Sequence, residues 1–175
     1  MRKQGLYRAS SRSEGLSLFS AIREGETMKY QKEFDEVKEL VLAAKGPEDV
    51  QSRVVISLRK NFPKYNWVGI YRLEGNDLVL GPFQGKPTVH TRIPVGTGVC
   101  GSAAVSKKTE VVPDVGADAR YLACSLETRS EIVVPIIKGG AFWGEIDIDS
   151  DRPNAFGPDD VELLERVARL LSERL

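Results

Sequence analysis

The two cysteines of this chain, Cys100 and Cys124, are the side chains with the greatest capacity for covalent chemistry. Cys100 lies in "GTGVCGSAAVSK", where a Gly-rich turn enters a predicted helix, and the dipole and N–H groups of a helix start favour a thiolate. Cys124 lies in a predicted loop close to Arg129, and loops carry chemistry more often than cores do. Taken alone, a cysteine is more often an inert buried thiol, and a separation of 24 residues establishes no contact between the two.

Acidic residues alternate with apolar ones in the predicted strand "AFWGEIDIDSD", which gives this strand two unlike faces. We predict that the apolar face meets helices and that the acidic face lies on the other side of a sheet. The apolar face would carry Phe142, Gly144, Ile146 and Ile148, and the acidic face would carry Trp143, Glu145, Asp147 and Asp149. The simplest interpretation of the acidic face is a solvated outer surface.

Two further predicted strands argue against bare solvent on that side. "WVGIY" has Trp67 and Tyr71 on one face, and "EIVVP" places Glu131 on the same side as Val133. A sheet face with Trp and Tyr is seldom left open to water, and the segment 81–128, which contains both cysteines, is the natural cover. The prediction is a partly enclosed pocket with aromatic walls, acids and a thiol. The alternative is that the two aromatic side chains simply pack under the loop.

The bulk composition narrows the class of protein. The 175 residues balance 25 basic against 25 acidic side chains, without the basic excess of nucleic-acid-binding proteins. No apolar run approaches the ~20 residues that span a membrane. Two cysteines make no disulfide framework and no secretory segment is recognisable, so we expect a cytoplasmic protein. The spacing of Cys, His and Asp matches no zinc-site pattern, and the only histidine, His90, has no identifiable triad partner.

The periodicity of the chain predicts an α+β layer fold that would position these residues. Apolar residues recur at helical spacing over 30–44, from Pro47 to Phe62, and after Gly157. Strands are predicted between these helices, as two hairpins over 65–83 and 130–151 and two short segments over 90–95 and 109–115. Residues 1–27, rich in Ser, Gly and Arg, are predicted to be a disordered tail.

Several motifs resemble, in order, those of the free methionine-(R)-sulfoxide reductases, a family with the GAF fold. The motifs are "WVGIY", "LGPFQGKP", "GVCGSA", "VPDV", "RSEIVVPI" and "GEIDIDS". The resemblance runs from about Met28 to the end and implies one GAF domain over 28–175. The implied fold is a central antiparallel sheet with helices on one face and a loop-covered ligand pocket on the other.

The resemblance also implies a set of site residues. The family's catalytic cysteine falls on Cys124, and the cysteine of its "GVCG" motif falls on Cys100. Its pocket aromatics and acids fall on Trp67, Tyr71, Glu131, Asp147 and Asp149. Many members carry a third cysteine near the position of His90, so this chain is more similar to the two-cysteine members, in which Cys100 would have to resolve the oxidised Cys124. The segment "GADARYLAC" also lacks the Phe-Pro-Gly-His run common before the catalytic cysteine.

The implied activity is thiol-dependent reduction of free methionine (R)-sulfoxide. Cys124 would become a sulfenic acid, a Cys100–Cys124 disulfide would follow, and a thioredoxin-type dithiol would recycle it, with no bound cofactor and no metal. The protein would be a monomer or a homodimer. The alternative is a non-catalytic GAF module that binds a ligand or senses redox state, because fold alone does not determine function.

Overall fold

A computed structural model describes residues 28–122 and 125–175, so the predicted tail 1–27 and the predicted nucleophile Cys124 lie outside the described residues. The helices are α1 (Gln31–Ala43), α2 (Pro47–Asn61), α3 (Gly98–Ser106) and α4 (Pro158–Ser172), with one short 3-10 helix, η1 (Val115–Ala117). The strands are β1 (Trp67–Glu74), β2 (Asp77–Gln84), β3 (Arg92–Pro94), β4 (Glu110–Val112), β5 (Ser130–Lys138) and β6 (Ala141–Ser150). The predicted α+β fold is confirmed.

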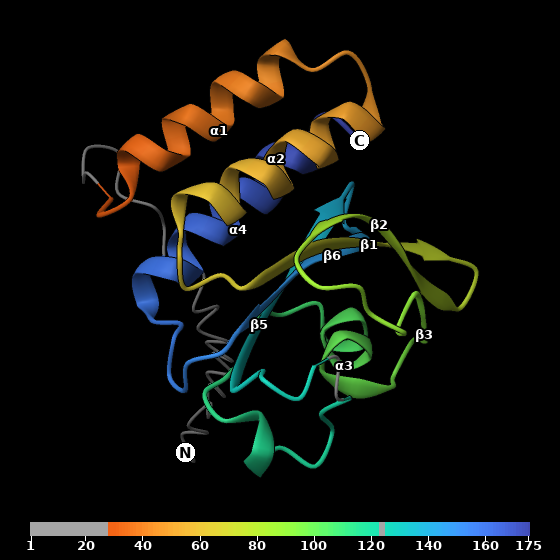
Figure 1. Cartoon of the computed structure of the whole chain (residues 1–175). Helices are drawn as coiled ribbons and strands as arrows, with labels where there is room; N and C mark the ends of the chain where they lie inside the picture. The colour runs from red at the N-terminus through yellow and green to blue at the C-terminus, as the bar shows by residue number, and fades with distance from the viewer. Residues whose placement is uncertain (1–27, 123–124) are drawn as a thin grey trace, which may run out of the picture.

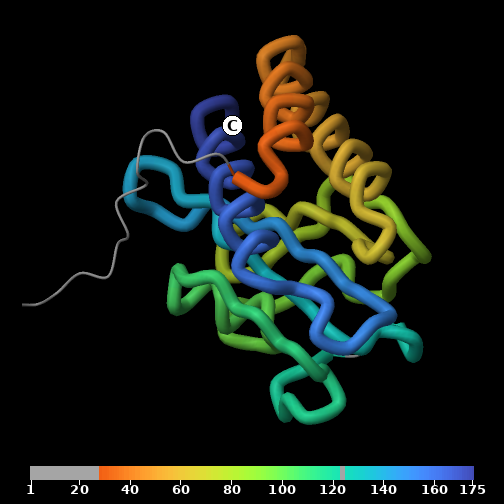
Figure 2. The backbone as a smooth tube through the Cα atoms, turned by 90° about the vertical axis from the view of Figure 1, so that its left-hand side faces the viewer, coloured from red at the N-terminus to blue at the C-terminus, as the bar shows by residue number. Residues whose placement is uncertain are grey.

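The six strands form one antiparallel sheet in the order β3-β2-β1-β6-β5-β4. Helices α2 and α4 pack on one face, α1 packs on their outer side, and α3 lies on the opposite face (Figure 1). A side view shows the same two layers, with α3 and the segment that follows it on the far side of the sheet from α1 and α2 (Figure 2). Among the described residues, no helix is long and apolar enough to cross a membrane.

Local sequence signals set the starts of α2 and α4, the two helices that pack on this face of the sheet. α2 begins at Pro47, whose fixed φ suits the first helical turn. α4 follows Gly157, whose N–H donates to the carboxylate of Asp160 at 2.9 Å. The same carboxylate accepts from the hydroxyl of Tyr65 at 2.7 Å and from Lys64, so it ties the start of α4 to the chain before β1.

The side chains between these helices and the sheet form an apolar core. Ile70, Ile132, Ile146 and Ile148 extend from the sheet into it, and none of these four side chains is exposed. Burying an aliphatic side chain of this size contributes about 1.5–3 kcal/mol. The helix-side core therefore provides most of the hydrophobic stabilisation of the fold.

One predicted side-chain assignment on β6 is wrong. The pairing of β5 with β6 shifts between Ile136 and Ile137, so that Ile137 pairs with Phe142 and not with Trp143. As a result Phe142 packs in the core on the α3 side, and Trp143 packs against the helix-side core. A β-bulge inserts one extra residue and reverses the alternation beyond it. Strict alternation holds only from Gly144 onward.

Candidate active site

The polar residues of three central strands lie on the face of the sheet that α3 covers. In the β1–β6 pairing Trp67 lies opposite Asp149, and Tyr71 lies opposite Glu145. In the β5–β6 pairing Glu131 lies opposite Asp149. Antiparallel partners point to the same face, so the predicted convergence of aromatic and acidic side chains occurs. The predicted alternative of a solvated acidic surface is wrong, because these side chains are buried.

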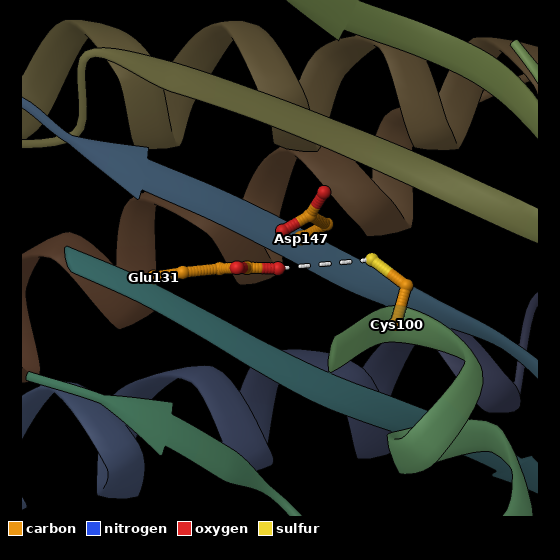
Figure 3. Close-up of side chains that lie close together, drawn as sticks. All are labelled: Cys100, Glu131 and Asp147. Carbon is orange, nitrogen blue, oxygen red and sulfur yellow. Dashed lines mark hydrogen bonds between the residues drawn. The ribbon is translucent and has the colours of Figure 1, made fainter. Parts of the chain in front are cut away.

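We call the side chains on this face of the sheet the pocket floor: Trp67, Tyr71, Glu131, Glu145, Asp147 and Asp149. Cys100 reaches the floor from the first turn of α3. The helix follows Thr97, and Cys100 is its third residue and is buried. Its Sγ lies 3.9 Å from Oε1 of Glu131, to which the thiol donates, and Asp147 lies beside the pair (Figure 3). Gly101 permits this placement, because a Cβ there would lie 2.7 Å from the backbone nitrogen of Gly96. The close packing of α3 on the preceding turn therefore fixes the position of the Cys100 thiol next to the acids.

Burial raises the pKa of every carboxyl on this floor. The pKa of Asp147 rises to about 7, because burial outweighs the thiol of Cys100 and the backbone of Ile148, which act in the opposite direction. The pKa values of Glu131 and Asp149 are raised well above their ordinary range by burial first and by the charge of Asp147 second. Buried carboxyls close to one another cannot all ionise, so this floor holds protons near neutral pH.

Glu145 is a fourth buried acid that the sequence prediction did not include among the site residues. It is fully buried, and burial together with the charge of Asp147 raises its pKa well above the ordinary range. Neither of its carboxylate oxygens has a hydrogen-bond partner in the described part of the chain. The alternation of β6 predicted that Glu145 lies on this face, but not that its side chain would be fully buried.

The aromatic side chains form one side of the floor. The Trp67 ring stacks on Phe83 with centroids 5.7 Å apart, and its Nε1–H donates to the carbonyl of Lys86 at 3.1 Å. The Tyr71 hydroxyl donates to the carbonyl of His90 at 2.7 Å. Both side chains thus bind the backbone of the segment between β2 and β3. The predicted alternative, that the two aromatic side chains pack under a loop, therefore also occurs.

A cavity of about 280 Å³ opens beside these residues. Trp67 and Asp149 line it from the sheet, and Arg59, Lys86 and Ser125 are among the residues that complete it. The side chains of Glu131, Asp147 and Cys100 lie outside this lining, deeper on the same sheet face. An ion pair between Lys86 and Glu127, with 2.6 Å between Nζ and Oε1, joins the two loops at its rim. The structure thus brings together all predicted site residues except Cys124, which lies outside the described residues.

Comparison with known proteins identifies the family. The GAF domain family model matches residues 47–175. The chain is 47% identical over 112 residues to the free methionine-R-sulfoxide reductase of Saccharomyces cerevisiae, a match that spans 62% of each chain. It superposes on the substrate complex of the free methionine-R-sulfoxide reductase of Neisseria meningitidis with a TM-score of 0.80 and 35% identity, covering 83% of this chain and 87% of that chain. It superposes on fRMsr of Staphylococcus aureus in complex with substrate with a TM-score of 0.78 and 36% identity, covering 86% of this chain and 97% of that chain. This protein therefore belongs to the GAF-domain family and, within it, to the free methionine-R-sulfoxide reductases.

Proposed function

We propose that this protein reduces free methionine (R)-sulfoxide, with Cys124 as the nucleophile and Cys100 as the resolving thiol. The observation that carries the proposal is the contact between Cys100 and Glu131 on a floor of buried, proton-holding acids. Family membership supplies the reaction class, and this floor supplies the groups that the reaction needs.

The cavity has the size and charges for a single amino acid. A volume of about 280 Å³ is at the lower limit for small-molecule sites, so it suits a free amino acid better than a peptide. Arg59 and Lys86 line it and offer cationic partners for the substrate carboxylate. Asp149 also lines it and offers an anionic partner for the substrate ammonium. Trp67 and Tyr71 would hold the S-methyl group, whose sulfur becomes partly cationic during attack.

The first chemical step transfers oxygen from the substrate to the enzyme. The Cys124 sulfur attacks the sulfoxide sulfur, and the sulfoxide oxygen accepts a proton from one of the floor acids, Glu131, Asp147 or Asp149. The oxygen then passes to Cys124 as a sulfenic acid, and methionine leaves with its sulfur reduced by two electrons. The raised pKa values of these carboxyls support this role, because a general acid must hold its proton at the working pH.

Two further steps would restore the thiols. The Cys100 thiol condenses with the sulfenic acid to form a Cys100–Cys124 disulfide and one water molecule. A thioredoxin-type dithiol then reduces this disulfide by exchange and is itself oxidised. These chemical steps require no bound cofactor, because the thiols and the external dithiol supply both electrons.

The test is oxidation of NADPH by the full chain with thioredoxin, thioredoxin reductase and free methionine (R)-sulfoxide. We expect turnover with the R epimer, none with the S epimer, and none after Cys124→Ser. Cys100→Ser should release one equivalent of methionine without thioredoxin but lose multiple turnover with it. A Cys100→Ser enzyme that recycles normally with thioredoxin would exclude the resolving role.

Matched variants separate the acids from general effects of charge. Glu131→Gln should lower kcat, whereas Glu162→Gln, on the exposed side of α4, should leave it unchanged. Absence of turnover by a folded wild-type protein, with an active reductant, would refute the reductase and favour the ligand-binding GAF module.

A further inference from the structure

Three side chains on the pocket floor have the arrangement of a metal-ligand set. Cys100, Glu131 and Asp147 each offer one ligand atom, and these atoms lie within 4.8 Å of one another (Figure 3). They come from three separate elements, α3, β5 and β6, so no spacing motif in the sequence could have indicated them. All three are buried, unlike the exposed acidic clusters that are common on protein surfaces.

The acids of this cluster have buried oxygens whose hydrogen-bonding capacity the described residues leave unused. Oε2 of Glu131 and Oδ1 of Asp147 are buried and have no hydrogen-bond partner within the ranges 28–122 and 125–175. Glu145, beside Asp147 on the same strand face, has two such oxygens. Buried polar atoms are normally satisfied, and among the described residues no lysine or arginine forms an ion pair with any of these carboxyls at 4.0 Å or less. Besides the protons that these carboxyls hold, a bound cation can satisfy such a group.

We propose that the floor binds one thiophilic divalent cation of the zinc class through Cys100, Glu131 and Asp147. The thiolate selects zinc over magnesium and calcium, which prefer all-oxygen sites. On binding, the thiol and any ligand carboxyl that is protonated lose their protons to solvent, and one sulfur–metal and two oxygen–metal bonds form with no change of oxidation state.

The observed spacing is close to that of a tetrahedral site. Zinc bonds of about 2.3 Å to sulfur and about 2.1 Å to oxygen, at a tetrahedral angle, separate the two ligand atoms by about 3.6 Å. The distance from Cys100 Sγ to Glu131 Oε1 is 3.9 Å. A contraction of a few tenths of an ångström therefore forms this edge of the site without a change in the backbone.

The proposed site has a consequence for activity. A metal thiolate at Cys100 cannot condense with a sulfenic acid, and the bound acids are no longer available to the substrate. Zinc would therefore inhibit the reaction. This consequence rests on the proposed function, whereas the binding itself does not.

Cobalt titration of the reduced full chain tests binding without any measurement of activity. We expect one equivalent of Co²⁺ to give a thiolate-to-cobalt charge-transfer band and the visible bands of a tetrahedral ion, both removed by Zn²⁺. Cys100→Ser should abolish the charge-transfer band, and Asp147→Asn should weaken binding by about tenfold or more. Zinc should also raise the melting temperature of the wild type by more than that of Asp147→Asn.

The second cysteine provides the matched control. Cys124→Ser should keep the charge-transfer band, because the proposed ligand set does not include Cys124. A wild-type protein without the band, a band that persists in Cys100→Ser, or a band lost in Cys124→Ser would each overturn the proposal. If the band is absent while NADPH oxidation proceeds, the metal site fails and the reductase stands.

Discussion

Replacement of Asp147 by asparagine should stabilise the protein at neutral and alkaline pH, although it removes a residue that we propose contacts the substrate. The pKa of Asp147 is about 7 in the folded protein, against an ordinary value of 3.8. The folded protein therefore holds this proton more tightly than the unfolded chain does. The contribution to stability is fully present at low pH and is lost as the pH rises from about 4 to about 7.

The magnitude follows from the difference between the two pKa values. About three pH units at about 1.4 kcal/mol each correspond to about 4 kcal/mol. Neighbouring carboxyls adjust their own protonation, so we expect Asp147→Asn to raise the free energy of unfolding by about 2–4 kcal/mol at about pH 8. The new amide N–H groups have acceptors close by, because Glu145 and Glu131 present oxygens without partners in the described structure.

Urea unfolding followed by circular dichroism, at about pH 4 and about pH 8, measures this effect. At about pH 4 the carboxyl is protonated in the folded state, and the variant should match the wild type to within about 1 kcal/mol. Asp35→Asn, at an exposed position of α1, is the matched control and should have no effect at either pH. A variant less stable than the wild type at about pH 8, or a gain that is the same at both pH values, would refute the reasoning.

Two further predictions concern Gly69 and Tyr65. A Cβ at Gly69 would lie 2.2 Å from the Trp67 ring, so Gly69→Ala should displace the indole, raise KM and cost about 1–3 kcal/mol of stability. Fluorescence reports the indole, steady-state kinetics give KM, and urea titration gives the stability. The stability of the control Gly46→Ala, whose Cβ meets nothing within 4 Å, should stay within about 1 kcal/mol of the wild type. A Gly69→Ala protein with unchanged fluorescence and KM would contradict this. Tyr65→Phe removes the 2.7 Å hydrogen bond to the buried Asp160 and should lower the melting temperature, for a loss of about 1–2 kcal/mol, without changing KM; a changed KM would show that the helix-side core affects the pocket.

The sequence was sufficient to predict the elements and the side of the sheet on which the chemistry lies. The period-2 pattern of β6 placed Asp147 and Asp149 on one face, and "WVGIY" placed Trp67 and Tyr71 there as well. The bulge near Phe142 could not be predicted, because it depends on pairing with β5, which is a contact between strands and not a property of one strand.

The sequence predicted that the segment 81–128 covers the acidic face, but not how deeply each acid is buried. An acidic strand face is ordinarily solvated, and the depth of burial depends on the placement of α3 and the loops. The same applies to Glu145, which shares the pattern of Asp147 but acquires its importance from full burial. The raised pKa values follow from that burial and therefore also depend on the tertiary structure.

Even-numbered and odd-numbered residues of β6 lie on opposite faces of the strand, so we expect mutations at the two sets to have different effects. From Gly144 to Ser150 the even-numbered Ile146 and Ile148 extend into the helix-side core, and the odd-numbered Glu145, Asp147 and Asp149 lie on the opposite face, which α3 covers. Selection for folding and selection for activity therefore act on alternate codons of one short segment. In a mutational scan of this segment, abundance should drop at even positions, whereas odd positions should lose activity in variants that accumulate normally. A lineage that changed its substrate could replace the odd set while leaving the even set intact.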